Sequence, residues 1–289
     1  MKTTTSPSTE SFFGDTEILM GDCREILPLI ESESVQCCIT SPPYWGLRDY
    51  DHACQVGAEE SPEQYVENLI GIFRQVRRVL RKEGTLWLNI GDGYARNGGM
   101  GVCGPNAKVG NTRKLVQKRN CKVPDCWGLK DRDLIGLPWR VAFALQVDGW
   151  ILRSRITWVK KAPIPESVKN RPSGATEEIF LLARETNYYY NNEAMREQSG
   201  ANLRNYWILG PDVSGTPHPA TFPRELARRC ILLGSRPGDT VLDPFSGSGT
   251  TGAVAKELHR KAILIELNEQ YVRQSEQRLR GGVQQALLL

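Results

Sequence analysis

Five consecutive residues could hold and activate an amino group: Thr40, Ser41, Pro42, Pro43 and Tyr44. The two prolines fix the backbone and have no N–H groups of their own, which leaves backbone carbonyl oxygens free to accept hydrogen bonds. The serine adds a hydroxyl, and the tyrosine adds a phenol and a flat ring on which a flipped nucleic-acid base could stack. An exocyclic amino group is a poor nucleophile because its lone pair is delocalised, and acceptors that hold its hydrogens out of the ring plane favour a nitrogen that can attack a methyl group. A structural Pro-Pro turn is the alternative.

A glycine-rich turn at residues 241–252 (VLDPFSGSGTTG) could bind a nucleoside. Its order is strand, tight turn and helix. The glycines let a ligand approach the backbone, and the N-terminus of the following helix offers N–H donors and the positive end of a dipole. Glu266 ends the next expected strand, where its carboxylate could accept both hydroxyls of a ribose.

The kind of nucleoside needs a separate argument. Gly247, Gly249 and Gly252 match the pattern G-x-G-x-x-G, and Glu266 lies 19 residues after the first of them, so a dinucleotide site has to be considered. Asp243 argues against it, because a pyrophosphate would bring more negative charge beside this carboxylate. A P-loop is excluded because no lysine follows the glycines. The carboxylate suits a cationic ligand that carries an ammonium or a sulfonium.

A basic segment separates the two motifs. Residues 93–124 contain seven basic side chains and no acidic one. Such a segment suits a phosphate backbone, and a solvated basic loop is the alternative. The basic residues are Arg96, Lys108, Arg113, Lys114, Lys118, Arg119 and Lys122.

The composition is that of a soluble globular protein, with 40% apolar and 24% charged residues and a net charge of +4 in 289 residues. No apolar run approaches the roughly 18 residues of a membrane helix, so we expect no membrane association. Residues 1–14 are expected to form a disordered lead, because the Ser- and Thr-rich start lacks the apolar core of a signal peptide. The eight cysteines favour reduced thiols in a cytoplasmic setting.

A zinc site is the alternative use of three of these cysteines. Cys103, Cys121 and Cys126 lie within one segment, but a fourth ligand is needed and the three histidines are distant in sequence. We expect no metal, because a sulfonium is already an activated methyl donor.

The elements that must position these residues alternate between strands and helices, which implies a mostly parallel sheet with helices on both faces. A single domain is expected over 15–285, with a long loop from 91 to 132 and an irregular stretch at 187–217. The expected strands are 16–20, 35–40, 85–90, 150–159, 178–183, 240–244 and 262–267. The expected helices are 23–30, one from 61 that Gly84 ends, 138–146, 222–233, 250–258 and 269–279.

Together, SPPY at 41–44 and DPFSGSGTT at 243–251 resemble the signatures of the amino-group DNA methyltransferases, [DNS]-P-P-[YFW] and D-P-F-x-G-x-G-T. The order of the two motifs is similar to that of the β class, and SPPYWGLRDY, LWLNIGDGY and GWILRSRITWVK resemble bacterial and phage-type members. The resemblance covers about residues 15–280. It implies an α/β fold of class I (Rossmann-like), circularly permuted, with a mostly parallel seven-stranded sheet and helices on both faces.

The resemblance also implies roles for single residues. S-adenosyl-L-methionine would be the cofactor. Asp22 would bind its adenine, with a plain helix cap as the alternative, and Glu266 would hold its ribose. Phe245, Gly247 and Gly249 would surround its methionine part, and Asp243 would lie near the amino end. The implied cofactor-binding residues are Asp22, Thr40, Thr221, Phe222, Pro223, Asp243, Pro244, Phe245, Gly247, Gly249, Thr250, Glu266, Leu267 and Asn268.

Double-stranded DNA is the implied substrate, in a bacterial or phage-infected cell. A target-recognition segment is expected at 187–217, and because it is short for the family, the basic insertion at 93–136 would share the reading of DNA. A cognate restriction endonuclease is a further partner that the resemblance allows, and a monomer and a homodimer are both compatible with it.

The target base is expected to be cytosine, methylated at N4, with adenine N6 as the alternative. A serine before Pro-Pro is commoner in cytosine-N4 members of the family, and a neutral hydroxyl can donate to the ring nitrogen or accept from the amino group. Other substrates of the same core are RNA and a protein glutamine amide. A non-catalytic DNA-binding module is the alternative of another class, although both motifs are intact.

Overall fold

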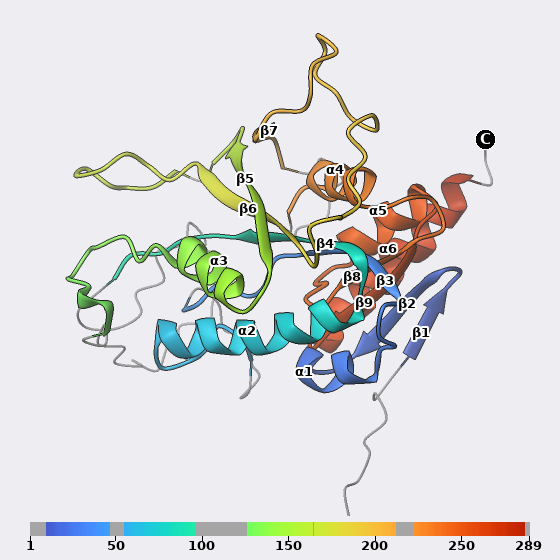
Figure 1. Cartoon of the computed structure of the whole chain (residues 1–289), viewed down its shortest axis with the longest axis horizontal. Coiled ribbons are helices and arrows are strands. Elements are labelled where there is room, and N and C mark those ends of the chain that lie inside the picture. Colours follow the sequence, from blue (N-terminus) through green and yellow to red (C-terminus); the bar gives the residue numbers. More distant parts are fainter. Residues whose placement is uncertain (1–9, 47–54, 96–125, 164, 212–221, 287–289) are drawn as a thin grey trace, which may run out of the picture.

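A nine-stranded sheet forms the centre of the protein (Figure 1). The computed structural model describes residues 10–46, 55–95, 126–163, 165–211 and 222–286. The strand order is β1-β2-β9-β8-β3-β4-β6-β5-β7, and β2, β9, β8, β3 and β4 run parallel. The strands are β1 (Glu10–Phe13), β2 (Thr16–Met20), β3 (Val35–Thr40), β4 (Leu80–Ile90), β5 (Ile151–Lys160), β6 (Thr176–Ala183), β7 (Tyr206–Leu209), β8 (Thr240–Asp243) and β9 (Lys261–Glu266).

Helices cover both faces of this sheet, as expected from the alternation in the sequence. One face carries α1 (Cys23–Ile26), α2 (Pro62–Val79) and α3 (Leu137–Val147), and the other carries α4 (Arg224–Gly234), α5 (Thr250–Glu257) and α6 (Glu269–Ala286). Short 3₁₀ turns are η1 (Leu27–Leu29) and η2 (Cys126–Gly128).

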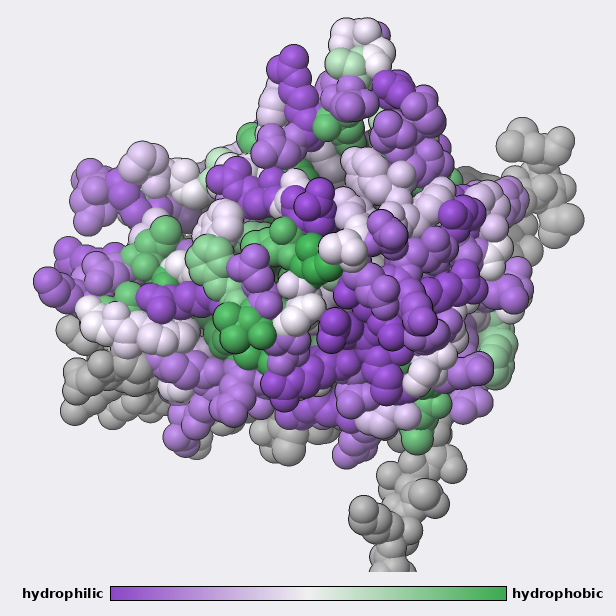
Figure 2. Space-filling model, viewed as in Figure 1, coloured by the Kyte–Doolittle hydropathy of each residue, from purple (hydrophilic) through white to green (hydrophobic). Residues whose placement is uncertain are grey.

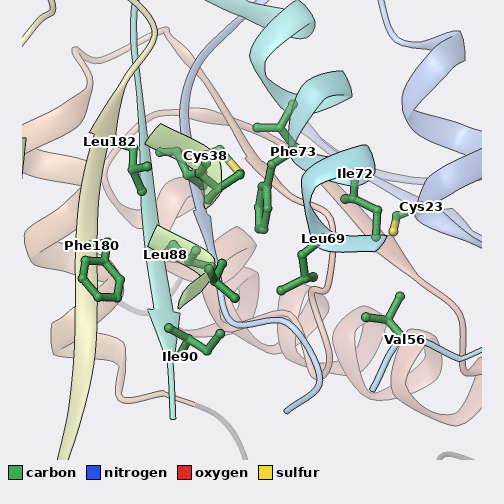
Figure 3. Packing of buried hydrophobic residues seen from close by; sticks show 14 of the residues in the cluster. Cys23, Cys38, Val56, Leu69, Ile72, Phe73, Leu88, Ile90, Phe180 and Leu182 are labelled. Atoms are coloured by element: carbon green, nitrogen blue, oxygen red, sulfur yellow. The ribbon is translucent and has the colours of Figure 1, made fainter. Parts of the chain in front are cut away.

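Two hydrophobic cores result from the alternation of side chains along the strands. Leu88 of β4 and Phe180 of β6 belong to the core under α2, whereas Trp87 of β4 belongs to the core under α4. Figure 3 shows Leu88 between Phe180 of β6 and Phe73 of α2. The central strands are therefore buried on both faces, and only their ends can reach solvent or a ligand.

Helix α2 begins where the sequence predicts and ends earlier. The Ser61 hydroxyl accepts a hydrogen bond from the Gln64 N–H at 3.3 Å, and Pro62 occupies the first turn. The predicted end at Gly84 is wrong, because Leu80 already has extended backbone angles and starts β4. The apolar spacing continues across this boundary, so that periodicity alone could not locate it.

The prediction of seven strands is also wrong, because β1 and β7 extend the sheet at its two edges. Residues 10–13 form β1 instead of part of a disordered lead, and they pair with β2 through a turn at Gly14, whose φ is +65°. Tyr206–Leu209 form β7 inside the stretch predicted to be irregular. Each has only four residues, too few for an alternating pattern to stand out.

The surface in Figure 2 is mostly hydrophilic, with hydrophobic side chains gathered around α3. Phe143 and Val147 are exposed there, and the rings of Trp139 and Phe180 form a T-shaped pair. Among the described residues, no helix is both long and apolar enough to cross a membrane.

Candidate active site

The two motifs meet at the carboxyl ends of neighbouring strands. β3 and β8 run parallel and pair Cys38 with Leu242, so the residues that follow each strand emerge at the same edge of the sheet. The Thr40 hydroxyl donates a hydrogen bond to Oδ1 of Asp243 at 2.7 Å. The SPPY motif therefore starts directly beside the glycine-rich turn, although about 200 residues separate the two motifs in the chain.

Asp243 holds this junction together and faces the protein interior. Its second oxygen accepts from the Thr251 hydroxyl at 2.6 Å, and Oδ1 also accepts from the Phe245 N–H at 3.1 Å. The residue is 1% exposed. Burial raises the pKa of the Asp243 carboxyl to about 6, against the opposing effect of these hydrogen bonds. The contacts of Asp243 thus fix the turn, and its expected place near a cofactor's amino end stays a prediction.

The glycines of the turn are required by its geometry. Gly247 and Gly249 have φ of +53° and +76°, a left-handed conformation that glycine adopts without steric cost. A Cβ on Gly249 would lie 2.8 Å from the Ser275 hydroxyl, and one on Gly252 would lie 2.5 Å from Leu264. The first approach brings α6 close to the turn and the second brings α5 close to β9, with Gly249 as the cap of α5.

Glu266 presents a carboxylate at the end of β9. Oε2 accepts from the Gly247 N–H and Oε1 accepts from the Asn268 N–H, each at 2.8 Å. Burial raises the pKa of the Glu266 carboxyl to about 7, although these backbone donors lower it. Each carboxylate oxygen has more than one acceptor site, so both can still take a hydroxyl, as the predicted ribose contact requires.

Two hydroxyls in the turn are buried without a hydrogen-bond partner among the described residues. They belong to Ser246 and Ser248, which are 5% and 2% exposed. A buried polar atom without a partner costs free energy, so such atoms often mark the place of a ligand or water. The turn therefore fits a ligand with a polar end, and both serines are positions that sequence reasoning missed.

Asp22 is placed near Glu266 and acts as a helix cap. The Gly21 N–H donates to the backbone oxygen of Glu266 at 2.9 Å. The Asp22 carboxylate accepts from the Arg24 N–H at 2.8 Å, and the Arg24 guanidinium also contacts it. The alternative of a cap is confirmed, and the contact with an adenine stays a prediction.

A cluster of polar side chains surrounds Ser41 on the other side of the junction. The Ser41 hydroxyl donates to the phenol oxygen of Tyr44 at 3.2 Å, and the Tyr44 phenol donates to Oε2 of Glu177 at 2.5 Å. Nδ2 of Asn89 lies 2.9–3.3 Å from an oxygen of each of these three residues. Nζ of Lys160 donates to the other Glu177 oxygen at 2.5 Å. We call Ser41, Tyr44, Asn89, Lys160 and Glu177 the polar cluster.

The backbone and ring of the SPPY motif are also held in place. A Cβ on Gly91 would lie 2.6 Å from Cε2 of Tyr44, so the ring packs directly on that backbone. The Pro43 carbonyl, expected to be free, accepts from the Tyr65 phenol at 2.9 Å. Burial and the neighbouring charge of Glu177 raise the pKa of the Tyr44 phenol well above its usual range. Tyr44 is therefore a fixed, protonated donor, and stacking of its ring on a base stays a prediction.

Asn89, Lys160 and Glu177 were not identified from the sequence. Asn89 is a polar residue near the end of the buried strand TLWLNI, and this signal alone could have found it. Glu177 comes from β6, which runs antiparallel to β4 with Asn89 opposite Ile179. Lys160 ends β5. Only the order of the strands places these two charges beside SPPY.

The remaining predicted residues lie on several elements or outside the described residues. Phe222 is buried in the second core, and Pro223 caps α4. The Thr250 hydroxyl accepts from Arg278 at 2.6 Å. Buried Pro244 follows Asp243, and Leu267 follows Glu266. Thr221, Cys103, Cys121 and all seven predicted DNA-binding residues lie outside the described residues, so these predictions stay open.

A pocket opens within the predicted target-recognition segment. It is lined by Tyr190, Asn192, Met195, Asn202 and Leu203. These side chains offer amide groups and one aromatic ring, and none of them belongs to the polar cluster. No group of three or more potential metal-ligating side chains occurs in the part of the chain that the structure describes.

Comparisons with known proteins place this geometry in context. The model of a family described as DNA methylase matches residues 35–277. The type II methyltransferase M.SmaI of Serratia marcescens is 45% identical over 276 residues, covering 93% of this chain and 92% of that protein. The type II methyltransferase M.Cfr9I of Citrobacter freundii is 47% identical over 265 residues, covering 90% and 86%.

Solved structures share the fold. A PvuII DNA methyltransferase described as cytosine-N4-specific has a TM-score of 0.70 at 22% identity, over 91% of this chain and 86% of that one. A putative DNA modification methylase from Thermus thermophilus, in complex with S-adenosyl-L-methionine, has a TM-score of 0.62 at 24% identity, over 92% and 95%. These similarities confirm the predicted fold class.

Proposed function

We infer that this chain, which belongs to the N6/N4 DNA methylase family, transfers a methyl group from S-adenosyl-L-methionine to the exocyclic N4 of cytosine in double-stranded DNA. The observation that carries the proposal is the hydrogen bond between Thr40 and Asp243. It joins the strand end before Ser41 to the strand end before the glycine-rich turn. A nucleoside bound at the turn and an amine held at Ser41 would therefore be neighbours.

The residues of the turn fit the cofactor part by part. The Glu266 carboxylate would accept the ribose hydroxyls, and the unpartnered hydroxyls of Ser246 and Ser248 would bind the polar methionine end. Asp22, at the end of the neighbouring strand, would accept from the adenine amino group. The bound cofactor supplies an electrophilic methyl group. The Thermus thermophilus methylase, solved with S-adenosyl-L-methionine, supports this cofactor.

The polar cluster would hold the target amine. The Ser41 hydroxyl donates its one proton to Tyr44, and its oxygen can accept a hydrogen bond from the target amino group. Holding the amine next to the methyl group turns a bimolecular reaction into a positioned one, which supplies much of the rate enhancement. Cytosine is preferred because a neutral hydroxyl, and not a carboxylate, precedes Pro-Pro. The cytosine-N4-specific PvuII enzyme supports this choice.

The basic insertion would contact the DNA because its two ends meet at the edge of the sheet that holds the polar cluster. Asp92 follows β4 by two residues and accepts from the N–H groups of Gly136 and Leu137, each at 3.0 Å. Tyr94 and Leu134 form a β-bridge. The described ends of the insertion therefore lie close to Asn89, and we propose that the basic residues between them contact a bound duplex.

Product analysis tests the proposed function. The protein would be incubated with S-adenosyl-L-methionine labelled in its methyl group and with duplex DNA, RNA or protein. The labelled polymer would be digested and its nucleosides separated by mass spectrometry. We expect label in DNA as N4-methylcytosine. Label at adenine N6 would overturn the choice of base, and label only in RNA or protein would overturn the choice of DNA.

A salt titration tests the role of the insertion. Replacing Arg113, Lys114, Lys118 and Arg119 with glutamine should weaken DNA binding at all sequences. The slope of the logarithm of the binding constant against the logarithm of the salt concentration should become less steep by about 0.9 for each lost phosphate contact. A control replaces Lys82 and Lys256, two lysines outside the insertion, with glutamine and should leave the slope unchanged. An unchanged slope in the quadruple variant would contradict the assignment.

A further inference from the structure

We propose that Glu177 receives the proton that the target amine loses, through a relay formed by the hydroxyls of Ser41 and Tyr44. The proposal deepens the proposed function and depends on it. Glu177 is a positioning residue at the far end of the relay, and Ser41 is the group that contacts the substrate.

The hydrogen bonds of the polar cluster already point in the direction that such a relay needs. Ser41 donates to Tyr44 at 3.2 Å, and Tyr44 donates to Glu177 at 2.5 Å. Each hydroxyl thus donates toward Glu177: the Tyr44 oxygen accepts from Ser41, and the Ser41 oxygen keeps a lone pair for the amine. A proton that arrives at Ser41 can be passed on with no rotation of Tyr44.

The other members of the cluster hold the relay in place. Lys160 binds the Glu177 oxygen that Tyr44 does not use. The amide nitrogen of Asn89, which has two hydrogens to donate, lies within hydrogen-bond distance of the oxygens of Ser41, Tyr44 and Glu177 and so helps to orient them. An amide has no basic site for the proton. Among the described residues, Glu177 is the carboxylate in hydrogen-bond contact with the SPPY side chains.

Nearby carboxylates are committed elsewhere. Asp243 accepts from Thr40, Thr251 and the Phe245 N–H. Asp92 accepts backbone N–H groups at the start of α3. Neither shares a hydrogen bond with Ser41 or Tyr44 in these contacts, which leaves Glu177 as the acceptor.

The reaction balances without any further reactant. The amine lone pair forms the nitrogen–methyl bond while the carbon–sulfur bond breaks and its electron pair goes to sulfur. The nitrogen becomes cationic and acidic, and its proton moves to the Ser41 oxygen. The Ser41 proton moves to Tyr44, and the Tyr44 proton moves to Glu177. The hydroxyls are restored, and the Glu177 carboxylic acid releases its proton to water between turnovers.

The relay would act in the transition state. Its hydrogen bond to the amine strengthens as positive charge develops on nitrogen, so it lowers the barrier more than it tightens ground-state binding. Loss of the acceptor should therefore reduce kcat and leave KM largely unchanged. A purely structural role would instead appear as weaker binding or lower stability.

The test compares E177Q with the wild type in single-turnover methylation of duplex DNA. Glutamine keeps the size of the side chain but cannot take the proton. We expect the methyl-transfer rate to fall about 10²-fold, with dissociation constants for S-adenosyl-L-methionine and DNA within about 2-fold of the wild type. E177D should recover part of the rate. E178Q is the matched control, because Glu178 is adjacent and pairs with Arg155, and its rate should be unchanged.

A double variant shows whether the residues act as one unit. Y44F interrupts the same relay, so Y44F combined with E177Q should be little slower than the slower single variant. An E177Q rate equal to that of the wild type, or a loss confined to binding, would overturn the relay. A wild-type enzyme that methylates adenine N6 would overturn only the choice of base, and the variants would still decide the relay. A wild-type enzyme inactive on DNA would overturn both proposals.

Discussion

The two halves of the site are built in opposite ways. The glycine-rich turn, residues 243–252 with Glu266, is mainly backbone: N–H groups bind the Glu266 carboxylate, and left-handed glycines shape the bend. The polar cluster is made of side chains from the ends of β3, β4, β5 and β6. The turn is contiguous in sequence, whereas Tyr44 and Glu177 are 133 residues apart.

This difference predicts which changes each half tolerates. A site made of backbone groups depends on residues that permit the conformation, so its weak points are glycines. A site made of side-chain groups depends on single functional groups, so it is most sensitive to substitutions that remove one of these groups. Substitutions in the cluster should reduce turnover with little effect on cofactor binding, and substitutions in the turn should affect cofactor binding or stability.

The largest effect is expected for Ser41→Ala. It removes the hydroxyl that would contact the amine, and turnover should fall by about 10²–10³-fold while S-adenosyl-L-methionine binding stays within about 2-fold. Steady-state methylation and calorimetric titration measure the two quantities. Ser34→Ala, just before β3 at its opposite end, is the control and should be neutral. Equal turnover in the Ser41 and Ser34 variants would contradict the assignment of chemistry to the cluster.

Gly91→Ala should have the next largest effect. Its Cβ would lie 2.6 Å from the Tyr44 ring, so the ring or the backbone of residue 91 must shift, which should disturb the hydrogen bond from Tyr44 to Glu177. A displacement of about 1 Å can cost up to about 10²-fold in rate, and we expect a loss of about 10–100-fold measured by single-turnover methylation. Gly71→Ala in α2 has open space around it and is the control. A Gly91 variant that keeps full rate would show that the position of Tyr44 is not critical.

A pH titration of cofactor affinity probes the turn. Burial raises the Glu266 pKa from 4.5 to about 7, so the folded protein keeps a proton that the unfolded chain has lost, and stability falls as pH rises through this window. Ribose hydroxyls that donate to Glu266 favour its ionised form. The affinity for S-adenosyl-L-methionine should therefore rise about 10-fold between pH 6 and pH 8.

The control for this titration is E266Q, whose side chain cannot ionise. Its affinity should be lower at pH 8 and should lack the gain between pH 6 and pH 8. Asp243, whose pKa is raised to about 6, is still present in this variant. Any change in cofactor affinity that comes from Asp243 would therefore also be seen with E266Q. The same gain in E266Q and in the wild type would rule out Glu266 as its source.

The smallest effect is expected for Gly252→Ala. Its Cβ would lie 2.5 Å from Leu264 inside the core, and such overpacking costs about 1–3 kcal/mol. Thermal unfolding should show a Tm lower by several degrees, with the turnover of the folded protein close to that of the wild type. Gly71→Ala should raise stability by about 0.5–1 kcal/mol. A large loss of turnover at unchanged Tm would contradict the expectation that substitutions in the turn act on stability or cofactor binding.

Prediction from the sequence succeeded where the signal is local. The helix after the turn, the strands on both sides of it and the Ser61 cap all follow from residues within a few positions of each other. It failed for β1 and β7, which are too short to show a period. It also failed for the end of α2, where apolar spacing continues into β4.

The sequence by itself determined which functional groups the two motifs contain. Consecutive residues contain SPPY, which we propose holds the amine, and the glycine-rich turn, which we propose binds a nucleoside, because both motifs would work through the conformation of a few adjacent residues. Only the tertiary structure decided which distant groups complete them. Parallel pairing of β3 and β8 joins Thr40 to Asp243, and antiparallel pairing of β4 and β6 brings Glu177 to Tyr44. Strand order depends on how whole sheet faces are buried, and no local pattern encodes it.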